Sequence, residues 1–214
     1  MNRPSFIPLT VTMALTCIAP AVAQDTMGGM LRGSVPLTFI GLDFSQAFFV
    51  ARQNFPGLDK EGPTYFDRWN ELLRTEMEKY NLSEPMKLDH VPTMVEYVRN
   101  VNAAVDLNEA WATGNVVFLK EHIPEMVKKY ATQDREGVGC VFIVGSFNMT
   151  LERSDLYVTF FGMKTHEVLH VEWIEGRPAG LGERNYWAGA VKDVLERIGG
   201  TYRREWEKKY LKGN

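Results

Sequence analysis

The chain has 214 residues, and its 24 Lys and Arg against 27 Asp and Glu give a net charge of −3. This mildly acidic balance, without a block of basic residues, argues against a nucleic-acid partner. An apolar content of 45% and an aromatic content of 12% predict a packed core rather than a disordered chain. The length is typical of one domain.

The N-terminus has the features of an export signal. Arg3 supplies a positive charge, residues 7–18 are mostly apolar, and Ala21-Val22-Ala23 fits the small-residue pattern of a cleavage site. The apolar segment is too short to span a membrane as an ordinary helix. We therefore predict cleavage after Ala23, no transmembrane span, and a periplasmic or secreted mature protein. Residues 24–214 would form a single α/β domain, in which residues 201–214 are a C-terminal helical appendage.

Apolar patterns of two kinds follow one another along the mature chain. Uninterrupted β-branched and aromatic runs are typical of strands covered on both faces, whereas apolar residues that recur every three or four positions predict helices. In chain order, these patterns predict a strand over 35–44, a helix over 65–80 capped by Thr64, a short strand over 86–90, a helix over 92–105, a loop over 106–114, a helix around Pro124, strands over 138–147, 156–163 and 168–174, a helix over 187–198 that stops at Gly199-Gly200, and a last short helix over 202–210.

Only a few polar residues separate the last three strands, which favours an antiparallel meander. Strands flanked by helices around one sheet give an α/β sandwich. We therefore predict a single sandwich domain, with a mixed sheet whose C-terminal, antiparallel, three-stranded meander is flanked by helices. The aromatic stripe Tyr202, Trp206 and Tyr210 should pack on this domain. Cys140, inside an apolar run, should be a buried thiol without an internal disulfide.

The string His166-Glu167-Val168-Leu169-His170 has the H-E-x-x-H spacing of zinc proteases. On a helix, His166 and His170 would share a zinc ion and Glu167 would be the general base. On a strand, four residues span roughly 13 Å, which one zinc with His–Zn bonds of about 2 Å cannot bridge. Val171 and Trp173 favour a strand. We therefore predict a turn at His166 and a strand through His170, with a zinc metalloprotease as the alternative.

Two other places carry candidate binding residues. Asp43 ends the first predicted strand, where a turn carboxylate is more common than a functional one. A Gly- and Pro-containing loop then leads into the helix that begins near Trp187, and Arg and Tyr are enriched at interface hot spots. A helix N-terminus can also hold an anion. The alternative is an ordinary loop with Trp187 in the core. The candidate binding residues of this loop are Arg177, Glu183, Arg184, Asn185 and Tyr186.

The C-terminal half resembles the TolB N-terminal, curli-secretion-lipoprotein and penicillin-binding-protein-activator group of envelope domains. The matching features are a strand that runs into a glycine (141–145), a second strand (156–163), and a turn and third strand in which His166 takes the place of the turn glycine. The chain is also similar to uncharacterised exported proteins of Bacteroidetes-type bacteria. The resemblance implies a non-enzymatic periplasmic module that binds another envelope protein, and it carries over no catalytic residue.

The sequence contains no coherent catalytic set, because no Gly-rich phosphate loop follows a strand and the serines lack a nucleophile-elbow context. We therefore predict a non-enzymatic exported binding or assembly protein of the bacterial envelope, without a cofactor. Its partner would be another envelope protein or a second copy of the chain. The zinc metalloprotease is the first alternative, and a binder of a small molecule or glycan is the second.

Overall fold

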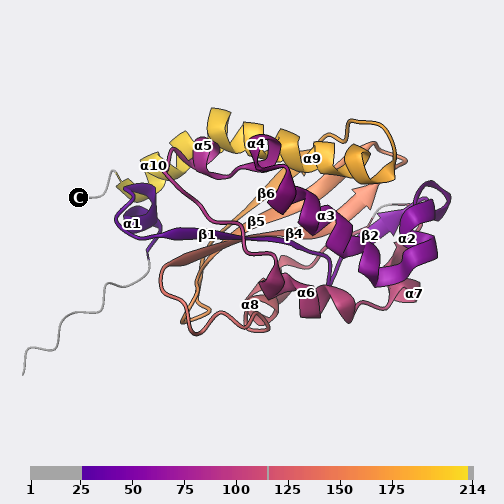
Figure 1. Ribbon diagram of the computed structural model, residues 1–214, viewed down its shortest axis with the longest axis horizontal. Coiled ribbons are helices and arrows are strands. Elements are labelled where there is room, and N and C mark those ends of the chain that lie inside the picture. Colours follow the sequence, from indigo (N-terminus) through magenta and orange to yellow (C-terminus); the bar gives the residue numbers. More distant parts are fainter. Residues whose placement is uncertain (1–25, 115, 212–214) are drawn as a thin grey trace, which may run out of the picture.

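A six-stranded mixed sheet organises the molecule (Figure 1). The computed structural model describes residues 26–114 and 116–211, so the predicted signal peptide at residues 1–23 lies outside the described residues. The strand order is β3-β2-β4-β5-β6, with β1 also beside β4. β1 and β2 run parallel to β4, and β4, β5 and β6 form an antiparallel meander, which confirms the predicted mixed α/β sheet. The strands are β1 (Leu37–Asp43), β2 (Phe48–Val50), β3 (Trp111–Ala112), β4 (Val138–Asn148), β5 (Arg153–Gly162) and β6 (Val168–Gly176).

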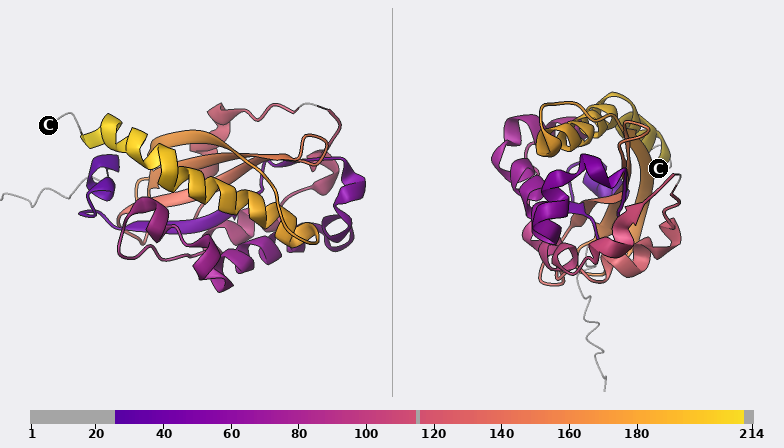
Figure 2. Two further views of the ribbon diagram at one scale, coloured as in Figure 1. Left: turned by 90° about the horizontal axis from the view of Figure 1, so that it is seen from above. Right: turned by 90° about the vertical axis from the view of Figure 1, so that its right-hand side faces the viewer.

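The first face of the sheet carries the larger part of the core. Aromatic rings stack there, for example Phe147 on Trp187 with ring centres 4.4 Å apart and planes 3° from parallel. Cys140 is buried in this cluster, and burial raises the pKa of its thiol well above the ordinary value. Figure 2 shows the C-terminal helical segment crossing the strands on this side. The helices that pack on the first face include α1 (Met27–Leu31), α2 (Pro56–Glu61), α3 (Tyr65–Thr75), α4 (Met77–Tyr80), α5 (Ser83–Met86), α9 (Glu183–Arg197) and α10 (Arg203–Leu211).

The second face has a smaller core under two helices, α6 (Glu96–Ala103) and α8 (Ile123–Val127). Ile40, Val141 and Ile143 of the sheet pack there against Val98 and Tyr130. These helices leave the part of the second face near β6 open, where Trp173 is 48% exposed.

Two asparagines cap the outer edge of β1 where no described strand pairs with it. Asn70 of α3 accepts a hydrogen bond from Leu42 N (2.8 Å) and donates to Leu42 O (3.1 Å). Asn102 of α6 donates to the same carbonyl (2.9 Å) and accepts from Phe44 N (2.7 Å). A Cβ on Gly41 would lie 2.3 Å from Asn70 Oδ1, and its φ is 96°, so glycine is required for this approach. The side chains thus give an edge strand the partners that a neighbouring strand would supply.

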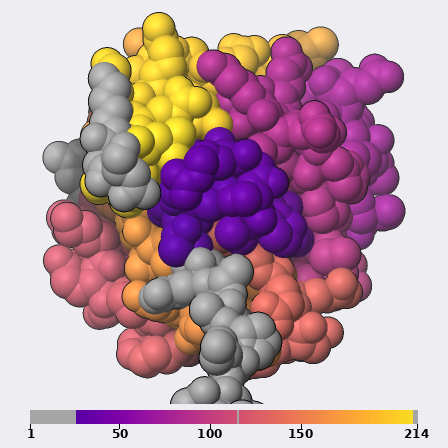
Figure 3. Space-filling view, turned by 90° about the vertical axis from the view of Figure 1, so that its left-hand side faces the viewer, coloured from indigo at the N-terminus to yellow at the C-terminus, as the bar shows by residue number. Residues whose placement is uncertain are grey.

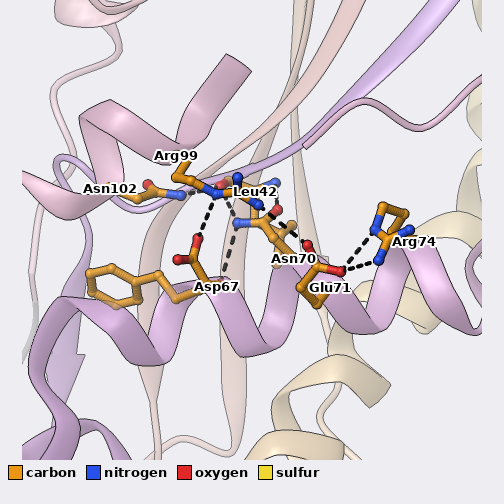
Figure 4. Close-up of polar contacts among 8 residues, drawn as sticks. Leu42, Asp67, Asn70, Glu71, Arg74, Arg99 and Asn102 are labelled. Atoms are coloured by element: carbon orange, nitrogen blue, oxygen red, sulfur yellow. Dashed lines mark hydrogen bonds and ion pairs between the residues drawn. The ribbon is translucent and has the colours of Figure 1, made fainter. Parts of the chain in front are cut away.

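Figure 4 shows the two asparagines converging on Leu42 from α3 and α6, with Arg99, Asp67 and Glu71 beside them. Arg99 lies 3.6 Å from Asp67 and 3.4 Å from Glu71, and all three are substantially exposed. Exposed ion pairs contribute little to stability. The buried asparagines therefore hold α3 and α6 against β1.

The predicted helix over 65–80 is interrupted. It forms α3 and α4, because Glu76 leaves the helical conformation with φ −105° and ψ 52°. The predicted cap at Thr64 is wrong: its backbone is already helical, and its hydroxyl donates to Glu61 O instead (2.7 Å). A capping side chain needs the extended backbone that a preceding 3₁₀ turn, η2 (Gly62–Thr64), does not provide here.

The predicted strand over 86–90 is also wrong. Lys87 adopts the left-handed conformation (φ 53°) after α5, and Val91 N donates to Ser83 Oγ (2.8 Å), so the segment folds back on itself. The next helix starts later than predicted, at Glu96 rather than near residue 92. The reason is that Phe39 N donates to Pro92 O (2.9 Å), which joins residues 92–94 to β1.

The sequence predicts a loop over 106–114, but the structure forms two short elements within it. Asp106 caps a short helix, α7 (Leu107–Ala110), by accepting from Asn108 N at 2.9 Å. β3 follows at once and pairs with β2, which lies in the segment 46–62 where the sequence predicts no element. Both strands are too short to have a periodicity of their own.

Gly199-Gly200 does not end the last long helix. A π-helical turn, η4 (Ile198–Tyr202), carries α9 directly into α10, and Trp206 is 1% exposed in the first-face core. The buried Arg203 donates to Leu31 O (2.8 Å) and Met86 O (2.9 Å) and thereby joins α10 to α1 and α5. Figure 3 shows α1 and α10 side by side at this end of the molecule. The predicted packing of the aromatic stripe is confirmed, and the segment is part of the core rather than an appendage.

None of the helices in the described residues combines the length and apolar character needed to cross a membrane.

Candidate functional site

Asp43 lies at the carboxyl end of β1 and is fully buried. Its carboxylate accepts hydrogen bonds from the Tyr130 hydroxyl and from Ser45 N (2.7 Å). Burial raises the pKa of Asp43 above its ordinary value of 3.8, although these hydrogen bonds and the charge of Lys129 oppose the rise. Burial and the Asp43 charge in turn raise the pKa of Tyr130 well above 10, which keeps the phenol a donor. Asp43 therefore fixes the turn that follows β1 and does not itself face solvent.

This turn forms one wall of a cleft of about 530 Å³, which we name the β1 cleft. The cleft lies where the chain passes from β1 to β2, and in open α/β sheets ligands bind beyond the carboxyl ends of parallel strands. Its other walls are the end of α6, α7 and Lys129. The lining residues are Ser45, Gln46, Ala47, Phe48, Asn100, Val101, Ala104, Val105, Asp106, Glu109, Ala110 and Lys129.

A second concavity of about 220 Å³, the Trp173 hollow, lies on the open part of the second face. Trp173 Nε1 donates to Asp155 Oδ1 (3.2 Å), and Ser146 Oγ donates to the other carboxylate oxygen (2.6 Å). Phe118 covers Tyr157 with ring centres 4.4 Å apart. The hollow therefore has fixed aromatic walls beside a hydrogen-bonded carboxylate. Its lining residues are Val116, Val117, Phe118, Gly145, Ser146, Arg153, Asp155, Tyr157 and Trp173.

The loop over 177–187 makes contacts that mostly hold the fold together. Glu183 accepts from Gly57 N (2.6 Å) and Leu58 N (3.1 Å) at the start of α2, and burial raises the pKa of its carboxyl. Trp69 Nε1 donates to Arg184 O (3.1 Å).

The backbone of the same loop is held in a similar way. Arg177 N donates to Asp193 (3.0 Å), and Tyr186 N donates to Gly182 O (2.9 Å). Arg177 and Asn185 are exposed, whereas Trp187 is buried in the core. The loop packs with the first face and Asp43 with the second, so the structure does not bring these predicted site residues together.

The H-E-x-x-H string forms a turn and a strand, as predicted. His166 has the left-handed φ (58°) expected of a residue in the place of a turn glycine, and β6 starts at Val168. The His166 ring lies near Phe161 of the second-face core, whereas the His170 ring lies near Phe160 of the first-face core. Neighbouring strand residues point to opposite faces. The two histidines therefore lie on opposite sides of the sheet, which is incompatible with a shared zinc ion.

His170 instead belongs to a polar cluster under α10. Its Nδ1 lies 3.1 Å from Tyr210 Oη, and its Nε2 lies 3.3 Å from Glu172, which also accepts from Trp206 Nε1 (3.2 Å). Burial, and then the charge of Lys209, lowers the pKa of His170 below its ordinary value of 6.5. This favours a neutral imidazole packed against aromatic rings.

Comparison of the chain with known proteins finds no matching family, no matching curated protein and no matching solved structure. Within residues 26–114 and 116–211, no group of three or more His, Cys, Asp and Glu side chains is placed to hold a metal ion.

Sequence reasoning missed the residues that line the two concavities. Trp173 carried the only available signal, because it alternates along β6 with His170 and Glu172. The burial is the reverse of a simple apolar-inward pattern, with His170 9% exposed and Trp173 48% exposed. Lys129 and Glu109 occupy ordinary helix-end positions, and nothing in their local sequence marks them.

Proposed function

We propose that the protein is a non-enzymatic, exported binding protein of the bacterial envelope, and that it docks another envelope protein at the Trp173 hollow. The observation that carries this proposal is the gathering of exposed Trp173 and Val117 with half-buried Tyr157 and Arg153 around one concavity. Trp, Tyr and Arg dominate the binding energy of protein interfaces.

The apolar part of the hollow supplies a reason for association. Trp173 is 48% exposed and Val117 75% exposed, and covering apolar surface contributes roughly 25 cal/mol per Å². The bond from Trp173 to Asp155 and the stacking of Phe118 on Tyr157 order the aromatic walls before a partner arrives. Preorganised side chains lose less entropy on binding.

The polar part of the hollow indicates which chemical group a partner must supply. Arg153 Nε is buried without a hydrogen-bond acceptor among the described residues, and its nearest carboxylate oxygen, on Asp155, is 3.5 Å away. The Arg153 side chain is nevertheless 35% exposed and both of its ion-pair distances, to Asp155 and Glu175, are long at 3.5 Å, so its outward N–H groups can donate to a partner. The fitting partner segment places an apolar side chain between Val117 and Trp173 and a carbonyl or carboxylate oxygen at Arg153.

Site-specific crosslinking tests the docking surface directly. A photo-crosslinking residue at Val117 should give one discrete adduct with an envelope protein in living cells, and Trp173→Ala should abolish it. Met77, which is 43% exposed on α4, is the matched control position and should give no such adduct. An adduct with a second copy of the chain would show that the hollow is used for self-association and not for docking another envelope protein. Equal labelling from both positions, or none from Val117, would refute docking at the hollow.

Export is tested separately, because it rests on the sequence of residues 1–23. The full chain expressed in a Gram-negative host should be recovered outside the cytoplasm with Gln24 as its first residue. Cytoplasmic protein that keeps residues 1–23 would refute the exported location and leave the docking surface to be judged by the crosslinking result.

A further inference from the structure

The β1 cleft has the size and setting of a ligand site, and it is separate from the Trp173 hollow. Its volume of about 530 Å³ lies within the range of roughly 300–1,000 Å³ that small-molecule sites occupy. The two concavities have no lining residue in common. A ligand in the cleft is therefore an inference independent of the docked protein.

Polar side chains without internal partners converge on this cleft. Among the described residues, Lys129, Glu109 and Asn100 make no ion pair and no side-chain hydrogen bond, although each lines the cleft. Ser45 also lines the cleft, but its hydroxyl is turned inward near the Asp43 carboxylate. In contrast, the neighbouring Lys128 is paired with Glu125 at 2.6 Å outside the cleft. The free hydrogen-bonding groups are thus concentrated where a ligand would meet them.

The charges come from different elements on either side of α6. Lys129 follows α8, whereas Asp106 and Glu109 belong to the start and body of α7, and α6 lies between these helices along the lower edge of Figure 1. Asp106 is partly used in capping α7, so Glu109 is the freer carboxylate. One wall is therefore cationic and another anionic.

Part of the cleft lining is apolar. Ala47 is 3% exposed, and Phe48, Val101 and Ala104 complete this part of the lining. Such a surface favours a ligand with a hydrocarbon or aromatic body between its polar ends.

We propose that the β1 cleft binds a small zwitterion of amino-acid or dipeptide size. Its carboxylate lies at Lys129 and Asn100, its ammonium group at Glu109 and Asp106, and its apolar side chain on Phe48 and Val101. An anion without an amine would face the carboxylates of Glu109 and Asp106 without offering them a cation, and a cation without a carboxylate would leave Lys129 without an anion. Opposite charges on different walls of one cleft therefore select for a ligand that carries both.

Calorimetric titration of the mature chain with four forms of one dipeptide tests this selection. The forms are Ala-Phe, its N-acetyl derivative, its C-terminal amide, and the derivative with both ends blocked. Ala-Phe should bind at least about tenfold more tightly than either singly blocked form, and the doubly blocked form should bind most weakly. Equal affinity for all four forms, or no heat from Ala-Phe in the millimolar range, would overturn the proposal.

Two variants test which residue of the cleft binds which charged end of the dipeptide. Lys129→Met should remove the preference for Ala-Phe over its amide, and Glu109→Gln should remove the preference over the N-acetyl form. Lys128→Met is the matched control and should leave both preferences unchanged. Trp173→Ala should also leave them unchanged, whatever its effect on protein docking. Loss of both preferences in Lys128→Met would show that the selectivity comes from general charge rather than from the cleft.

Discussion

The two faces of the sheet differ in how completely helices cover them. In the part of the chain that the structure describes, the first face is covered by helices such as α3, α9 and α10 and by stacked rings such as Phe147 and Trp187. The second face has a smaller core under α6 and α8 and carries the Trp173 hollow, whereas the β1 cleft lies beyond the carboxyl end of β1, where residues of both cores line it. The difference teaches that incomplete coverage of a sheet can leave unpaired side chains available for binding while the opposite face supplies stability.

A pair of tryptophans gives the largest test of this division. Trp187→Ala removes a ring buried in the first-face core and should cost about 3–5 kcal/mol of unfolding free energy. Trp173→Ala removes a half-exposed ring on the second face and should cost less than about 1 kcal/mol. Urea unfolding of both variants measures the contrast. Equal losses would show that the two faces do not differ as described.

The asparagine cap tests the boundary between the faces. Asn102→Ala leaves Phe44 N without its acceptor and should cost about 1–3 kcal/mol. Asn100→Ala, two residues away on the same helix, removes a side chain with no internal bond and should change stability by less than about 0.5 kcal/mol. Chemical denaturation compares the two. A large loss in Asn100→Ala would assign it a structural role and weaken the ligand proposal.

Asp43, which packs with the second face, should make the free energy of unfolding depend on pH with a defined sign. Because burial raises its folded pKa above 3.8, the stability it contributes is present at low pH and is lost as pH rises through the raised pKa. Asp43→Asn keeps groups that can bond Ser45 N and Tyr130 but removes the buried charge. The stability of this variant relative to wild type should therefore increase between acidic and neutral pH, as measured by thermal unfolding. A relative decrease would contradict the assignment.

His170, which packs with the first face, should make the free energy of unfolding depend on pH with the opposite sign, and this is the smallest effect that we expect. Burial lowers its folded pKa below 6.5, so the stability it contributes is present above 6.5 and is lost as pH falls through the lowered pKa. Glu172, Lys209 and Tyr210 surround the ring. His170→Phe should pack with the same aromatic neighbours and lose less stability than wild type on acidification. Parallel curves for the two proteins would show that His170 does not titrate in this range.

Local patterns predicted the meander well because its strands are long and consecutive. The runs over 138–147, 156–163 and 168–174 each have enough apolar residues to be identified alone, and short turns force neighbours to pair. The same runs placed His166 in a turn and His170 on a strand, which separates their side chains. The candidate residues of the 177–187 loop were conspicuous in sequence, but Glu183 and the loop backbone are mainly engaged in internal hydrogen bonds.

The elements that local patterns missed depend on distant partners. β2 and β3 have only three and two residues, and their pairing with β4 and with each other defines them. Gly199 and Gly200 each disfavour a helix by about 1 kcal/mol. The burial of Trp206 and the bonds of Arg203 to Leu31 and Met86 outweigh that local preference.

The sequence by itself determined the class of the fold, the meander and the strand that carries His170, because each depends on periodicity within a few neighbouring residues. Only the tertiary structure decided which side of β6 is buried, since that depends on where the helices pack. It also decided that Lys129, Glu109 and Asn100 meet around one cleft, although 29 positions separate the first and last of them. A site assembled from separate helices has no characteristic spacing of residues in the sequence, because its residues come together only when the core has formed.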